Sequence, residues 1–251
     1  MAIYLGNKKI STKSGYVATG MKDFFAAGGT CQKLTATNID NLIKFDDTSN
    51  VTNMSDMFYD CRNLTTIPLI DTSNATNMSN MFYNCERLTT IPELNTGNVT
   101  NMDSIFYYCV RLTAIPVLNT SNVTNMLNMF RNCINLITIP ELNTSNVSNM
   151  RNMFSDCPSI TTIPALDVSN VNDMGSIFYS CRNLTEIHMT GMKVSFDIHY
   201  STKFTREALV EILNNLATVT STKTLTMGST NLAKLTNEDK AIATNKGWTL
   251  A

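Results

Sequence analysis

The sequence predicts an elongated α/β solenoid with one parallel sheet, short helical turns and an α/β cap at its C-terminal end. Three observations carry this prediction. Cysteine returns every 24 residues, a phenylalanine stands three residues before each of these cysteines, and each 24-residue unit is too small to bury its own apolar positions. Neighbouring units must therefore stack on one another to form a continuous core.

The recurring cysteines and phenylalanines form the predicted core ladder. A residue that returns once per coil stacks on its own copies, so we interpret both sets as structural and not catalytic. The cysteines are Cys61, Cys85, Cys109, Cys133, Cys157 and Cys181, and the phenylalanines are Phe58, Phe82, Phe106, Phe130, Phe154 and Phe178.

Residues 1–46 are predicted to form an N-terminal cap. Cys31, followed by Leu34 and Thr35, copies the C-x-x-L-T of the later units but lies 30 residues before Cys61. We interpret this segment as a divergent first repeat with a six-residue insertion. Terminal repeats commonly depart from the consensus because one of their faces meets water.

Residues 47–190 hold six 24-residue units. Within a unit, the spacing of three to four between the methionine, Met-Phe and cysteine positions predicts a short helical turn. The LTTIP segment is rich in β-branched residues and predicts a short strand that proline ends, so that each coil adds one strand to a parallel sheet. His188 replaces this proline in the sixth unit, which indicates that the array ends there.

Residues 191–251 are predicted to form an α/β cap on the last coil. Thr205 is the expected N-cap of a helix through REALVEILNNL, whose apolar residues share one face. KTLTMG is expected to be a strand, and Thr236 the N-cap of a second helix that Gly247 stops. The final WTLA segment, with Trp248, is expected to be a strand.

Composition excludes several kinds of partner. Charged residues make up 16% of the chain and the net charge is −1, so neither nucleic acid nor an anionic membrane surface is an expected partner. No apolar run is long enough to cross a membrane, and the first residues contain no apolar run of signal-peptide length. We expect no membrane insertion, and the compartment stays open.

The repeated string N-x-T-N-M-x-x-M-F-x-x-C-x-x-L-T-x-I-P-x-L is nearly intact in TNMSNMFYNCERLTTIPEL. It closely resembles the repeat of BspA-like leucine-rich repeat proteins, strongly over residues 47–190 and more weakly over the flanks. The resemblance implies a leucine-rich-repeat-like solenoid in a family of bacterial surface proteins and adhesins, some of which bind host matrix proteins or other cells. Relatives are also expected in bacteriophage genomes. A cell-surface, extracellular or virion location is therefore favoured.

The cysteines allow three interpretations. Stacked coils would place neighbouring thiols within the Cα range of a disulfide, and cysteine is also a zinc ligand. Against a metal site stand the lack of any C-x-x-C motif and the presence of only two histidines. We predict buried free thiols that pack as small hydrophobic side chains, with no metal and no cofactor.

Asparagine recurs at two turn positions of each unit. At the first position five of the six copies lie in N-x-S/T sequons, which could carry glycans in a eukaryotic secretory pathway; we favour an asparagine ladder that satisfies backbone groups. The first set is Asn50, Asn74, Asn98, Asn122, Asn146 and Asn170, and the second is Asn53, Asn77, Asn101, Asn125 and Asn149, with Asp173 in the sixth copy.

Candidate binding residues lie where the repeats differ, because these positions are free of the stacking constraint. Tyrosine and arginine dominate them, and both are common in contact surfaces, although an ordinary solvated face is the alternative. The candidates are Tyr59, Tyr83, Tyr107, Tyr179, Arg62, Arg87, Arg111 and Arg131.

These observations favour a non-enzymatic recognition or adhesion module that binds a protein or a glycan through a solenoid surface. No nucleophile elbow, phosphate loop or metalloprotease motif is present. The alternative is a structural subunit of a larger assembly, such as a phage virion or a surface filament, in which the chain assembles with copies of itself.

Overall fold

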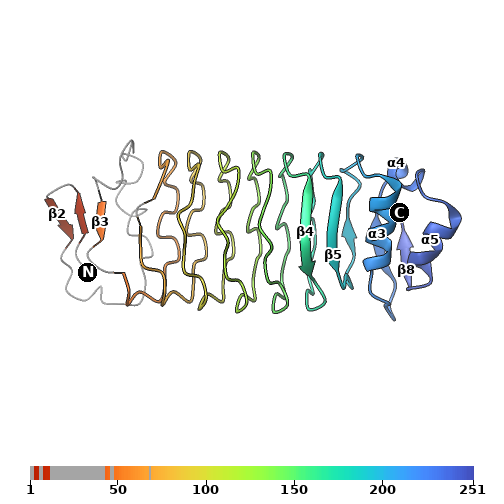
Figure 1. The fold of residues 1–251 in the computed structure, drawn as a ribbon, viewed down its shortest axis with the longest axis horizontal. Coiled ribbons are helices and arrows are strands. Elements are labelled where there is room, and N and C mark those ends of the chain that lie inside the picture. The colour runs from red at the N-terminus through yellow and green to blue at the C-terminus, as the bar shows by residue number, and fades with distance from the viewer. Residues whose placement is uncertain (1–2, 6–7, 12–42, 46–47, 68) are drawn as a thin grey trace.

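The computed structural model describes residues 3–5, 8–11, 43–45, 48–67 and 69–251. It shows a solenoid-like row of stacked coils with a small sheet at the N-terminal end and helices at the C-terminal end (Figure 1). The N-terminal sheet is antiparallel, with the strand order β2-β1-β3. Its strands are β1 (Ile3–Leu5), β2 (Lys8–Ser11) and β3 (Ile43–Phe45). The predicted divergent repeat around Cys31 lies outside the described residues.

Tight turns build the segment around each cysteine, where a short helical turn was predicted. In the first coil the Tyr59 N–H donates to the Asp56 carbonyl at 3.1 Å, and the Cys61 N–H donates to the Phe58 carbonyl at 3.2 Å. Asp56 and Asp60 have φ angles of 56° and 60°. The helical prediction is wrong because a left-handed residue ends right-handed helical geometry, and two such residues occur in every coil.

Backbone hydrogen bonds join each coil to the next. The Phe58 N–H donates to the Met81 carbonyl at 2.9 Å, and equivalent bonds recur one coil further along. Parallel bridges also connect the second asparagine set from one coil to the next. Their side chains accept a hydrogen bond from the N–H two residues later, as Asn77 does from Ser79 at 2.9 Å. These Asx turns hold the bend of each coil.

The first asparagine set also connects coils. Asn98 Nδ2 donates to the Ser73 carbonyl and Asn122 Nδ2 to the Gly97 carbonyl, each at 2.7 Å. The predicted ladder that satisfies backbone carbonyls is therefore confirmed at these positions. The ladder lies on the surface, since both asparagines are exposed.

The predicted single parallel sheet is wrong for the described coils. Within the six described coils, parallel strands pair at one place, between β4 (Thr162–Asp167) and β5 (Glu186–Thr190) of the last two coils, with an irregularity between Ile163 and Leu166. Earlier coils make isolated bonds on this side, such as Thr89 N–H to the Thr65 carbonyl at 3.2 Å. Proline lacks the N–H that a continuous ladder needs, and pairing extends where His188 replaces it.

The core is a column of repeated apolar side chains. Successive phenylalanine rings from Phe58 to Phe178 stack nearly parallel, with centroids 5.6–6.0 Å apart. These phenylalanines are at most 1% exposed, and the cysteines beside them are fully buried. Close packing in such a column restricts each coil to side chains of similar volume.

The C-terminal cap contains the predicted elements and two others. Helix α3 (Arg206–Asn215) begins after Thr205, which accepts a hydrogen bond from the Ala208 N–H, and α5 (Asn237–Thr244) begins after Thr236 with a capping box. Strands β7 (Lys223–Thr226) and β8 (Trp248–Leu250) are also present. The prediction missed β6 (Phe196–Asp197) and α4 (Ser229–Leu232).

Strands β6, β7 and β8 form a second small parallel sheet. Helix α3 packs against β5, the strand of the last coil, and against α5. Its buried side chains are Leu209, Ile212 and Leu213. The cap therefore covers apolar surface that the last coil would otherwise expose to water.

Candidate functional site

The cysteine rung is a hydrogen-bonded part of the core. Cys109 Sγ donates to the Phe82 carbonyl at 3.2 Å and Cys133 Sγ to the Phe106 carbonyl at 3.0 Å. Each of these carbonyls also accepts the N–H of the cysteine in its own coil. Burial raises the pKa of these thiols well above its ordinary value, which suppresses the reactive thiolate.

The prediction of free thiols holds for five cysteines and is wrong for one. Cys85, Cys109, Cys133, Cys157 and Cys181 are free and buried. Cys61 is disulfide-bonded. Among the described residues, no three His, Cys, Asp or Glu side chains gather where they could hold a metal ion.

A column of tyrosines lies one residue after the phenylalanine ladder. The Tyr59 and Tyr83 rings stack with centroids 4.6 Å apart, and the Tyr83 and Tyr107 rings with centroids 4.5 Å apart. The Arg131 guanidinium continues the stack 5.7 Å from the centroid of Tyr107. Burial, together with the neighbouring tyrosines, raises the pKa of Tyr83, so its hydroxyl stays protonated near neutral pH.

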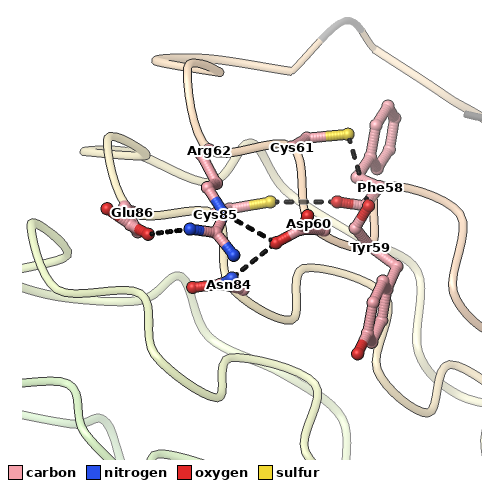
Figure 2. A network of polar contacts seen from close by, with 8 residues as sticks. All are labelled: Phe58, Tyr59, Asp60, Cys61, Arg62, Asn84, Cys85 and Glu86. Atoms are coloured by element: carbon pink, nitrogen blue, oxygen red, sulfur yellow. Dashed lines mark hydrogen bonds and ion pairs between the residues drawn. The ribbon is translucent and has the colours of Figure 1, made fainter. Parts of the chain in front are cut away.

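A polar network begins beside this column (Figure 2). Arg62 Nε lies 2.8 Å from Asp60 Oδ1, and an Arg62 terminal nitrogen lies 3.5 Å from Glu86 Oε1. Asn84 Nδ2 also donates to Asp60 Oδ1. The hydrogen bond that Arg62 donates to Asp60 is the main reason that the pKa of Arg62 is raised. Arg62 is therefore held between two carboxylates that compensate its charge.

The tyrosine column and the polar network enclose a surface pocket of about 300 Å³, called here the first pocket. Its lining comes from three successive coils and consists of Arg62, Tyr83, Asn84, Glu86, Tyr107 and Tyr108. Three of the predicted binding residues, Arg62, Tyr83 and Tyr107, are thus brought together. Tyr59 and Arg131 extend the same tyrosine column beyond the pocket.

Tyr108 was missed by the sequence prediction. Its side chain is 40% exposed, and its φ angle is 61°. Among the described non-glycine residues with positive φ, the others are aspartate, asparagine or serine, which adopt this conformation more readily. The sequence did contain a signal for Tyr108. The residue before each cysteine is Asp, Asn, Tyr, Asn, Asp and Ser along the array, so the tyrosine is the one large side chain at this position.

A second pocket, of about 310 Å³, lies further along the same face. Its lining residues are Asn132, Ile134, Asp156, Pro158, Ser180 and Arg182. All of them stand immediately before or after a cysteine, as do Arg62, Asn84, Glu86 and Tyr108 of the first pocket. The two pockets therefore use equivalent positions, in coils one to three and in coils four to six.

The remaining predicted binding residues line neither pocket. Arg87 and Arg111 are exposed, and each stands two residues after the cysteine of its coil, whereas the pocket residues Arg62 and Glu86 stand directly after theirs. Tyr179 is 44% exposed and packs edge-on against Tyr200 of the cap, with ring centroids 4.8 Å apart. In the described part of the chain, no helix is long and apolar enough to cross a membrane.

Comparison with known families gives one match. The model of the family described as "Mycoplasma protein of unknown function, DUF285" matches residues 19–133 and again residues 111–209. These two matches together span more than half of the chain and include every coil that contributes to the pockets. No curated protein matches the chain.

Proposed function

The chain belongs to the DUF285 family, and we propose that it is a non-enzymatic recognition module that binds a protein or a glycan through the face containing the two pockets. The family description names no function. The proposal therefore depends on the surface of this chain. We also propose that its solenoid-like fold is leucine-rich-repeat-like and related to the BspA-like repeats, as the repeated string suggests.

The observation that carries the proposal is the first pocket. The coils repeat their core residues closely, yet this pocket combines two stacked tyrosines with Arg62, Glu86 and Tyr108, at positions where other coils carry different residues. Aromatic and arginine side chains gather there, in a concave site with a few polar groups, as is common in recognition sites. Side chains that only served the stack would repeat with it.

The rigidity of the array supports this role. Backbone hydrogen bonds hold each turn to the next coil, and stacked rings hold the tyrosines at fixed spacing. Side chains that are ordered before binding lose less conformational entropy when a ligand arrives. A partner would thus meet a preformed surface.

An array of glycans and extracellular matrix proteins tests the proposal. The purified chain is compared with the triple variant Tyr59→Ser, Tyr83→Ser and Tyr107→Ser. Serine is compatible with this position because Ser155 occupies it in the fifth coil. We expect binding to at least one partner and loss of that binding in the variant, with circular dichroism confirming that the variant is folded.

Two results would contradict the proposal: no binding to any arrayed partner, or binding that the triple variant retains in full. Light scattering on the same samples separates the structural alternative. Concentration-dependent assembly into large particles, without binding on the array, would favour a structural subunit.

A further inference from the structure

The two pockets occupy equivalent positions on one face of the array. Each is lined by side chains that flank the cysteines of three coils, joined in the first pocket by Tyr83 and Tyr107, and their volumes are about 300 and 310 Å³. Coils stacked at strand spacing repeat every ~4.8 Å, so equivalent points in the two pockets lie about 14 Å apart along the array. A linear ligand lying parallel to the array would pass over both.

The backbone along this line is already hydrogen-bonded. The N–H groups of Asp60, Asn84 and Tyr108 donate to carbonyls of the following coil at 2.7–2.8 Å. An extended peptide that binds by adding a strand needs free backbone groups at a sheet edge. These turns do not supply them, so a ligand here must be recognised through side chains.

The charges in both pockets are mixed. Arg62 is paired with Asp60 and Glu86 in the first pocket, and the second pocket contains both Asp156 and Arg182. A site for phosphate, sulfate or an acidic peptide would concentrate positive charge that has no such partner. Paired carboxylates, guanidinium groups and amides instead offer both donors and acceptors, which suit the hydroxyl groups of a neutral ligand.

Tyr108 gives the first pocket an apolar surface. An L-residue in the left-handed region is strained, because its Cβ lies too close to the following carbonyl oxygen. Asparagine stands at the equivalent position in the second and fourth coils, where it tolerates this conformation. The exposed tyrosine is therefore unfavourable for the fold. Its ring can pack against the apolar C–H face of a sugar while polar neighbours bond the hydroxyls.

We propose that the two pockets are subsites for one linear, neutral oligosaccharide, with Tyr108 as the aromatic platform of the first subsite. This proposal rests on the proposed recognition function and names the ligand class of the same face. It assigns the sugar ring to Tyr108 and its hydroxyl groups to Asn84, Glu86 and Arg62. In the second subsite Asn132 and Asp156 supply amide and carboxylate groups at the position before the cysteine, which Asn84 occupies in the first subsite.

Isothermal titration calorimetry tests the proposal with four probes of equal length: cellohexaose, maltohexaose, the hexamer of N-acetylglucosamine, and a heparin hexasaccharide. We expect at least one neutral hexaose to bind and the heparin fragment not to bind. The corresponding neutral trisaccharide should bind more weakly, because it covers one subsite.

The decisive variant is Tyr108→Asn, which introduces the residue of the neighbouring coils. We expect it to weaken binding of the neutral hexaose by at least about tenfold, which is the usual scale for losing an aromatic stacking contact. The matched control is Val117→Thr, since Val117 is 78% exposed in the segment after Pro116 and lines neither pocket. It should bind as the unaltered chain does.

Three results would overturn the proposal: no binding of any neutral hexaose, tighter binding of the heparin fragment, or unchanged affinity in Tyr108→Asn. The recognition function would survive each of them if the array experiment found a protein or charged-glycan partner that the tyrosine triple variant loses. Failure of the ligand class and failure of the recognition function are thus distinguishable.

Discussion

At the scale of single residues, the cysteine of each coil from the second to the sixth combines packing with hydrogen bonding. Its thiol donates to a phenylalanine carbonyl of the preceding coil, at 2.9 Å for both Cys157 and Cys181. That carbonyl is buried and has a second lone pair to satisfy. Cysteine fills the site as a small apolar side chain and also supplies the donor.

Replacing Cys133 with alanine should lower the free energy of unfolding by about 1–3 kcal/mol, since it removes buried volume and leaves the second lone pair of the Phe106 carbonyl without a donor. Urea denaturation followed by circular dichroism measures the change. Cys133→Ser keeps a donor and should lose less than Cys133→Ala. Equal stability of Cys133→Ala and the unaltered chain would show that the thiol has no such role.

Thiol titration should detect the buried cysteines only after unfolding. Burial raises the pKa of Cys181 to about 12 and raises the pKa of Cys109 well above its ordinary value, so almost no thiolate exists at pH 8. We expect negligible reaction of the five free cysteines in the native chain and full reaction in denaturant. Rapid labelling of any of them without denaturant would contradict the described core.

Tyr108→Asn should raise the free energy of unfolding by about 1 kcal/mol, because asparagine adopts the left-handed conformation at lower cost than tyrosine. Thermal and urea unfolding both report this change. If Tyr108→Asn is more stable but no longer binds the neutral hexaose, Tyr108 is present for function and not for stability. A decrease in stability would mean that packing of Tyr108 on Tyr107, with ring centroids 6.2 Å apart, outweighs the backbone strain.

At the scale of elements, the junction between the last coil and its cap depends on His188. Its Nδ1 lies 2.7 Å from Glu211 of α3, and its Nε2 lies 3.6 Å from Glu186 of β5. The hydrogen bond to Glu211 is the largest cause of its raised pKa. Protonated His188 therefore connects a strand of the array to a helix of the cap.

This junction should be weaker at alkaline pH. Because the folded pKa lies above the unfolded value near 6.5, the stabilisation is complete below that value and is lost as the pH rises through the folded pKa. The pair is partly exposed, so the effect should stay below about 1 kcal/mol. The urea midpoints of the unaltered chain and of His188→Gln are measured at pH 6 and at pH 8. The two proteins should differ more at pH 6 than at pH 8. Identical differences at both pH values would exclude the ion pair as the cause.

The elements of the cap were predictable because their signals are local. Thr205 and Thr236 lie at helix starts, and Gly247, with a φ angle of 86°, follows the last helix. The four-residue α4 was missed because Gly228 before it offers no side-chain cap. The helical turn in each coil was wrongly predicted, since apolar spacing does not reveal the two left-handed residues that interrupt it.

The candidate site was predictable only in part. Tyr83, Tyr107 and Arg62 occupy positions at which the residue type varies along the array because the core does not constrain it. The repeat pattern therefore identified them as surface residues. Tyr108 became a candidate only once its left-handed backbone and its exposure were known. Which arginines reach the pocket depends on side-chain direction within the turn, which a repeat pattern does not specify.

At the scale of the whole molecule, the repeat separates two tasks. Positions that recur supply the core column and the hydrogen bonds between coils, whereas positions that vary supply the pockets. Side chains from coils far apart in sequence are thereby placed on one face at a regular spacing. We propose that this face, and not the side formed by the strands and prolines, meets the partner.

A two-dimensional amide NMR spectrum of the labelled chain, recorded with and without the neutral hexaose that binds best, tests this claim most directly. We predict chemical-shift changes concentrated in residues 59–62, 83–86, 107–110, 131–134 and 155–158, with residues 113–118 and 161–166 unchanged. Changes concentrated in residues 113–118 and 161–166 instead would contradict the account.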